Sequence, residues 1–152
     1  MDGNKTLIAY VTKSGVTGEN AEIISHVLEE HYGFEVNLVN LKKNSKPDLS
    51  QYVNIIIGSG IRMGMWYGKA NRFLKKIFDN QKVAIFLSSG MAGVPESYEE
   101  AISKFINKKL AKNPQVNPVA IAAFGGRAFN FDYTDPEKVK VWALELGKKL
   151  SA

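Results

Sequence analysis

A short segment rich in glycine and hydroxyl side chains, Thr12 to Gly18, could bind an anion. Its glycines allow a tight turn that aims backbone N–H groups inward, and Thr12, Ser14 and Thr17 offer hydroxyl donors. An amphipathic helix follows, so its partly positive start faces the same place. This combination suits a phosphate monoester. The Gly-Lys-Ser/Thr ending of a P-loop is missing, and an ordinary turn with Thr17 as the helix cap is the alternative.

A second segment, residues 58–68, holds four glycines together with Met63, Met65, Trp66 and Tyr67. Aromatic and thioether side chains pack well against a flat, polarizable ring, and glycine lets a peptide bond flip at little steric cost. The alternative is a buried loop in which Trp66 closes the core.

Two later segments have a related character. Residues 88–95 are small and glycine-rich, as is needed where backbone lies close to the edge of a ring. Residues 125–133 are rich in aromatic side chains and either shape the approach to a ligand or close the edge of the sheet.

Alternating strands and helices position these segments. Five short, β-branched, apolar runs predict strands, and amphipathic helices follow the first, third, fourth and fifth of them. The polar stretch 42–51 is too short for a full helix. The pattern predicts a doubly wound α/β fold with a five-stranded parallel sheet, in strand order 2-1-3-4-5 or 3-2-1-4-5. In either order, ligands bind beyond the carboxyl ends of the strands. The predicted strands are Thr6–Val11, Phe34–Val39, Val53–Gly58, Lys82–Leu87 and Pro118–Phe124.

Length and composition narrow the possible functions. The 152 residues suit one domain, 1–152, and the absence of cysteine excludes disulfides, thiolate metal sites and iron–sulfur clusters. With two histidines, a metal site is not expected. The net charge of +5 favours acidic partners, but the lysine pairs are dispersed, so nucleic acid is not expected. A polar N-terminus and the lack of a long apolar run predict a cytoplasmic protein without a membrane-spanning segment.

The first segment resembles the phosphate loop of the flavodoxin family, in which a T/S-x-T/S-G-x-T motif wraps the phosphate of FMN. The matching residues are Thr12-Lys13-Ser14-Gly15-Val16-Thr17, preceded by Tyr10 on the first strand. The resemblance implies strand order 2-1-3-4-5, hydroxyl donors from Thr12, Ser14 and Thr17, and N–H donors from Lys13 to Thr17. Lys13 departs from the family, which binds this phosphate without a cation.

The resemblance extends to the next two segments. It implies contacts with the flavin ring from Ser59, Gly60, Ile61, Arg62, Met63, Gly64 and Trp66, and from Ser89, Gly90, Met91 and Ala92. Gly64 best matches the glycine whose carbonyl turns toward the flavin, with Gly60 second. Met63, Trp66 or Tyr67 would stack on the ring, and Met91 replaces the usual outer tyrosine.

The resemblance implies an FMN-binding electron carrier with no catalytic side chain, a monomer or weak dimer. Family members are typically acidic, so this basic chain would serve redox partners with acidic surfaces. An alternative is an FMN-dependent oxidoreductase, because Gly60-Ile61-Arg62-x-Gly64-x-x-Tyr67 resembles the flavodoxin-like menaquinone-dependent protoporphyrinogen oxidases. Against this, the added segment of that branch after the fourth strand is missing. A third reading is a flavin-free phosphate-binding module on the same fold.

Overall fold

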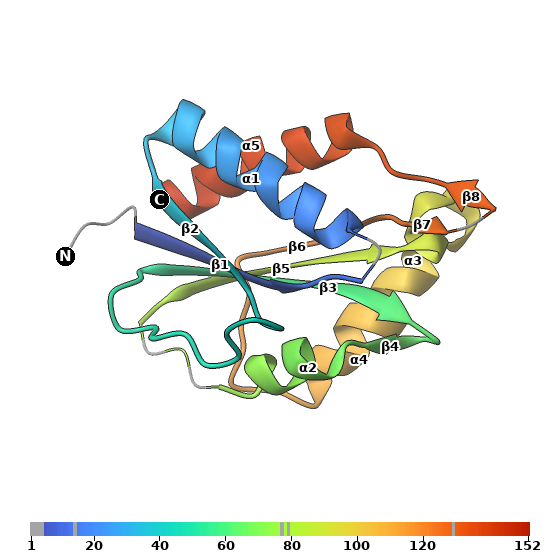
Figure 1. Cartoon of the computed structure of the whole chain (residues 1–152), viewed down its shortest axis with the longest axis horizontal. Coiled ribbons are helices and arrows are strands. Elements are labelled where there is room, and N and C mark those ends of the chain that lie inside the picture. Colours follow the sequence, from blue (N-terminus) through green and yellow to red (C-terminus); the bar gives the residue numbers. More distant parts are fainter. Residues whose placement is uncertain (1–4, 14, 77, 79, 129) are drawn as a thin grey trace.

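A parallel β-sheet forms the middle of the molecule (Figure 1). The computed structural model describes residues 5–13, 15–76, 78, 80–128 and 130–152. Five parallel strands lie in the order β2-β1-β3-β5-β6, and the short strand β4 pairs with β3. This confirms the predicted doubly wound fold and the strand order 2-1-3-4-5. The five strands are β1 (Lys5–Val11), β2 (Glu35–Asn40), β3 (Asn54–Arg62), β5 (Lys82–Ser89) and β6 (Ala120–Gly125).

Helices cover both faces of the sheet (Figure 1). Helices α1 (Val16–Tyr32) and α5 (Pro136–Ser151) lie on one face. On the other lie α2 (Gly68–Leu74) and a longer helix made of α3 (Tyr98–Ala101), a π-helical turn (Ile102–Asn107) and α4 (Lys108–Ala111). Two 3₁₀ turns, Gly90–Gly93 and Pro95–Ser97, lead from β5 into α3.

The sheet divides the hydrophobic core into two clusters. Alternate residues of β3 illustrate this division, because Ile55 and Ile57 pack toward α2 while Ile56 packs toward α1. All three side chains are fully buried. Burial of both faces explains the continuous apolar runs of the third and fourth predicted strands, which are β3 and β5.

Glycines set both ends of α1. Gly15 is the N-cap with φ of 92°, and Gly33 ends the helix with φ of 66°. The N–H groups of Gly33 and Phe34 donate to the carbonyls of Glu29 and Leu28, which satisfies the last turn. The alternative in which Thr17 caps the helix is wrong, since Thr17 lies inside α1 and is buried.

The segment after the third strand differs from the predicted loop. Strand β3 continues to Arg62 and turns back into β4 (Met65–Trp66) as a tight hairpin. Its two turn residues, Met63 and Gly64, have φ of 52° and 77°. Two positive φ values are what a type I′ turn requires, and this turn matches the twist of paired strands. Glycine meets the requirement without strain, whereas methionine does not.

The segment that joins β2 to β3 is not helical. No helix lies between Leu41 and Val53, as the polar stretch there predicted. Within the described residues, no helix has the length and apolar character needed to cross a membrane.

Candidate functional site

A pocket of about 300 Å³ lies at the carboxyl ends of β1, β3 and β5. The topology of the sheet brings three of the sequence-predicted segments to this place, and a fourth comes from the chain after β6. That fourth segment is a small hairpin of β7 (Arg127–Ala128) and β8 (Phe131–Asp132). The residues that line the pocket are Thr12, Lys13, Val16, Thr17, Gly60, Ile61, Arg62, Tyr67, Ser88, Ser89, Gly90, Gly126, Arg127, Ala128 and Phe131.

The wall of the pocket next to α1 has the donors and the positive charge that an anion site needs. The Gly15 N–H donates to Thr12 Oγ1 at 3.0 Å, which fixes the turn and leaves the Thr12 hydroxyl proton free to point elsewhere. Helix α1 starts immediately afterwards, so its first N–H groups and partial positive charge face the same region. Lys13 and Val16 complete this wall. Ser14 lies outside the described residues.

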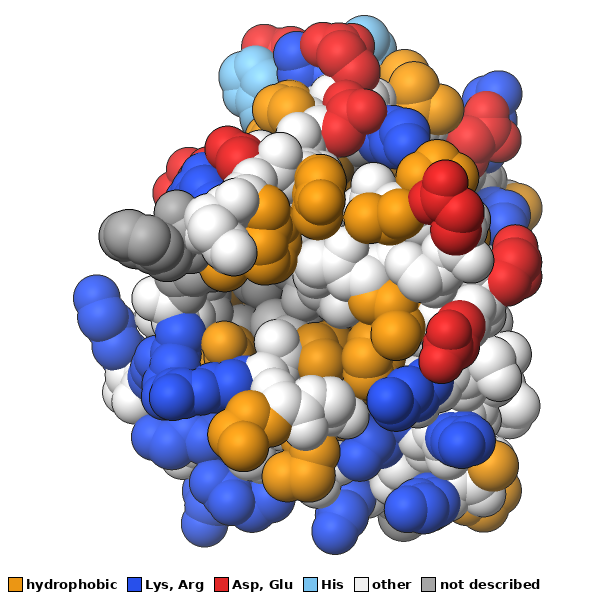
Figure 2. Space-filling view, turned by 90° about the vertical axis from the view of Figure 1, so that its right-hand side faces the viewer, with side chains coloured by type: hydrophobic (Ala, Val, Ile, Leu, Met, Phe, Trp, Pro, Cys, Tyr) orange, Lys and Arg blue, Asp and Glu red, His pale blue; other side chains and the backbone are white. Residues whose placement is uncertain are grey.

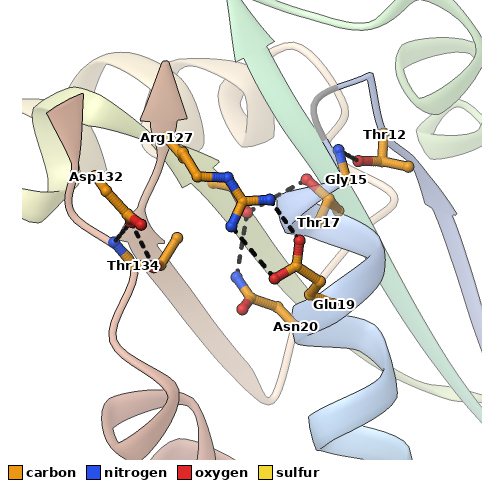
Figure 3. Close-up of polar contacts among 9 residues, drawn as sticks. Thr12, Gly15, Thr17, Glu19, Asn20, Arg127, Asp132 and Thr134 are labelled. Atoms are coloured by element: carbon orange, nitrogen blue, oxygen red, sulfur yellow. Dashed lines mark hydrogen bonds and ion pairs between the residues drawn. The ribbon is translucent and has the colours of Figure 1, made fainter. Parts of the chain in front are cut away.

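Thr17 takes part in a buried hydrogen-bond network that joins α1 to β5 (Figure 3). Its hydroxyl donates to Ser88 Oγ at 3.2 Å, and Asn20 Nδ2 donates to the same oxygen at 3.3 Å. All three residues are buried. The Thr17 hydroxyl therefore lies at the pocket wall with a protein partner, which the sequence pattern did not predict.

An ion pair crosses from the β7–β8 hairpin to α1 beside the pocket (Figure 3). Arg127 NH2 lies 2.6 Å from Glu19 Oε2. The hydrogen bond and charge of Glu19 raise the pKa of Arg127, so this side chain stays cationic. At the end of the same hairpin, the hydroxyl and N–H of Thr134 bind Asp132 and lower the pKa of its carboxyl. Sequence reasoning missed Arg127 as a site residue.

Two aromatic side chains, Tyr67 and Phe131, line the pocket. A Cβ at Gly60 would lie 2.9 Å from the Tyr67 ring, and a Cβ at Gly90 would lie 2.8 Å from the Phe131 ring. Glycine at these two positions therefore lets each ring lie directly against the backbone of the site. Burial raises the pKa of the Tyr67 phenol, and the positive charge of Arg62 opposes this shift.

Of the three candidates for stacking on a ring, the structure places only Tyr67 at the pocket. Met63 stands at the hairpin tip with 91% of its side chain exposed. Trp66 is buried in the core on the far side of the hairpin, where its Nε1–H donates to the Phe105 carbonyl at 2.7 Å. Met63 and Trp66 therefore lie outside the lining of this pocket, and Trp66 packs as a core residue, as the alternative stated.

The remaining predicted residues take supporting positions. Gly64 lies in the hairpin turn, outside the pocket lining. Ser59 is buried, and its Oγ accepts a hydrogen bond from the Tyr67 N–H at 3.3 Å, so it holds the backbone of that aromatic residue. Met91 packs against the core and Ala92 is buried. Met91 and Ala92 therefore lie outside the lining of this pocket.

The sequence of this chain is similar to those of known proteins. The family model described as a flavodoxin domain matches residues 7–150. Protoporphyrinogen IX dehydrogenase [quinone] of Escherichia coli (strain K12) is 27% identical over 125 residues, which are 80% of this chain and 68% of that protein.

Solved structures show the same fold. Oxidised flavodoxin 2 of Bacillus cereus has a TM-score of 0.68 and 24% identity, and the match covers 95% of this chain and 99% of that one. Oxidised flavodoxin 1 of the same organism has a TM-score of 0.63 and 18% identity, covering 97% of each chain. Rubredoxin oxygen:oxidoreductase of Desulfovibrio gigas has a TM-score of 0.68 and 17% identity, covering 97% of this chain but 36% of that one.

Proposed function

Because the chain belongs to the flavodoxin-domain family, we propose that it binds FMN in the pocket between α1 and the β7–β8 hairpin and carries electrons between redox partners. The meeting of the Thr12–Thr17 turn with Gly60, Tyr67 and Gly90 around one pocket carries this proposal. FMN, when bound, supplies one- and two-electron transfer.

The chemistry of the pocket fits FMN at both ends. Thr12, Lys13 and the start of α1 offer donors and positive charge to a phosphate, and no Asp or Glu is found among the described residues that line the pocket. Tyr67 and Phe131 offer faces for the ring, and the backbone of Ser89 and Gly90 offers polar groups to its edge. The volume is at the lower end of the range of about 300–1,000 Å³ for ligand sites, which favours a cofactor with an exposed edge. The basic chain would present that edge to partners with acidic surfaces.

Comparison of FMN with riboflavin tests the phosphate end directly. Thr12→Val keeps the shape of the side chain but removes the hydroxyl that accepts from Gly15. In the proposed complex this hydroxyl also donates to the phosphate of FMN, which riboflavin lacks. We therefore expect the Kd for FMN to rise about tenfold, as for loss of a hydrogen bond to a charged group, and the Kd for riboflavin to change less than about twofold. Fluorescence quenching of each flavin measures both constants. Equal weakening of the two ligands would contradict the assignment of this loop.

An FMN-dependent oxidoreductase of the protoporphyrinogen oxidase type is the second candidate. The E. coli relative, whose name states a quinone-dependent protoporphyrinogen dehydrogenase, favours it. Anaerobic photoreduction followed by absorbance separates the two functions. Two resolved one-electron steps support the carrier, whereas a single two-electron step together with oxidation of protoporphyrinogen supports the enzyme.

A further inference from the structure

A second pocket, of about 270 Å³, lies beside the β3–β4 hairpin. It shares no lining residue with the first pocket. Within the part of the chain that the structure describes, four lysines and no Asp or Glu line this pocket. Figure 2 shows that Lys and Arg side chains gather in the lower half of the face at the carboxyl ends of the strands, while Asp and Glu side chains lie above. The lining residues are Gly64, Met65, Trp66, Asn71, Lys104, Phe105, Lys108, Lys109 and Lys112.

The positive charges of this pocket lack counter-ions within the described part of the chain. None of the four lysines forms an ion pair with a described carboxylate. Lys109 Nζ instead donates to Asn71 Oδ1 at 2.8 Å, and Lys104 Nζ lies 5.8 Å from the centre of the Phe105 ring. Burial lowers the pKa of Lys109, and the charges of Lys112 and Lys75 add to this shift. A bound anion would relieve this repulsion.

The wall of the pocket is built by an unusual piece of helix. Lys104 and Phe105 belong to the π-helical turn Ile102–Asn107, and Lys108 follows it. The Phe105 carbonyl accepts the hydrogen bond from the buried Trp66 indole at 2.7 Å, which fixes the apolar floor against this wall. Single π-helical turns occur frequently at functional sites.

We propose that this pocket binds a small ligand with two or more phosphate or carboxylate groups. Four lysines from one helix line the pocket, so several anionic groups can be bound together. The small volume excludes a large ligand, and the Trp66 and Phe105 floor leaves room for an apolar linker between the anionic groups.

Isothermal titration with sodium tripolyphosphate at low salt tests the site on the full chain. The test variant is Lys108→Gln with Lys112→Gln, because both side chains are exposed and their removal leaves the core intact. The matched control is Lys148→Gln with Lys149→Gln, which removes the same charge near the end of α5, away from the pocket (Figure 1). We expect the Kd to rise about tenfold in the test variant and less than about twofold in the control.

A parallel titration with citrate distinguishes the ligand chemistry, since tighter tripolyphosphate binding indicates a phosphate ligand and tighter citrate binding indicates a carboxylate ligand. Either result supports the site. A Trp142→Phe background leaves Trp66 as the fluorescence probe at the floor, and its emission is expected to change on binding. Failure of the wild type to bind either anion would overturn the proposal. Equal affinities in test and control variants would also overturn it, since the anion would then bind elsewhere, such as at the Thr12–Thr17 turn.

Discussion

The hydroxyl of Ser88 holds two buried donors at the wall of the first pocket. Thr17 and Asn20 of α1 both donate to it, and no buried side-chain polar atom among the described residues lacks a partner. A residue at the end of β5 therefore anchors the start of α1. The sequence pattern predicted Thr17 as a donor to a phosphate. It could not indicate the hydrogen bond from Thr17 to Ser88, because the two residues are 71 positions apart.

Replacement of Ser88 by Ala should therefore lower stability. Two buried donors would lose their acceptor, and we expect the free energy of unfolding to fall by about 2 kcal/mol. Urea unfolding measures the change. Ser103→Ala, at an exposed helical position, is the control and should change stability by less than about 0.5 kcal/mol. Similar values for both variants would show that the network does not stabilise the fold.

Tyr67 should make stability depend on pH in the alkaline range. Burial raises the pKa of its phenol in the folded state, so the unfolded chain loses this proton first as the pH rises. The free energy of unfolding should therefore fall above about pH 10, and less steeply in Tyr67→Phe. The phenolate absorbance, as the difference between wild type and this variant, should titrate above the ordinary value. Arg62→Gln should raise the midpoint further, and a midpoint at or below the ordinary value would refute this assignment.

At the scale of elements, the β3–β4 hairpin separates the two pockets. Gly60, Ile61 and Arg62 line the first, whereas Met65 and Trp66 line the second. The sequence predicted a glycine-rich loop here, because residues 58–68 hold four glycines and the returning strand β4 has only two residues. The sequence left open whether Trp66 meets a ligand or closes the core, since its direction depends on the Phe105 carbonyl at the π-helical turn.

Met63→Asn should stabilise this hairpin. Asparagine adopts positive φ more readily than methionine, and the exposed Met63 side chain gives up little packing. We expect the free energy of unfolding to rise by about 0.5 kcal/mol. The control, Met65→Asn, changes an exposed strand residue of the same hairpin and should give no gain. Thermal unfolding compares the two, and a loss of stability in Met63→Asn would contradict the turn type.

At the scale of the whole molecule, the fold followed from the sequence more completely than the site did. The central strands β3 and β5 are buried on both faces, so their apolar runs mark them locally, and the alternation of strands and helices limits the topology. The positions of Arg127 and Phe131 depend instead on how the chain after β6 folds over α1. Local patterns carry no information on such long-range packing, although the aromatic character of 125–133 was a signal.

Helix α1 packs so closely on α5 that Gly147 leaves no room for a side chain. A Cβ at Gly147 would overlap the Tyr32 ring, whose hydroxyl donates to the Leu144 carbonyl at 2.6 Å. Gly147→Ala should therefore lower stability by about 2 kcal/mol, although alanine favours helix. Gly68→Ala, where the added Cβ would meet only the flexible Arg72 side chain, is the control and should be neutral or stabilising. Urea unfolding measures both, and a stable Gly147→Ala protein would show that the two helices can separate without loss.

The exposed methionines of the hairpin tip also have a chemical consequence. Met63 and Met65 expose 91% and 68% of their surface, whereas a thioether in a core is shielded from solvent. Among the described methionines, peroxide would convert these two side chains to sulfoxides first, and the added oxygens would make the tip polar. Because Met65 lines the lysine-rich pocket, oxidation of the hairpin tip would place a polar sulfoxide beside the lysine ammonium groups and would leave the buried core intact.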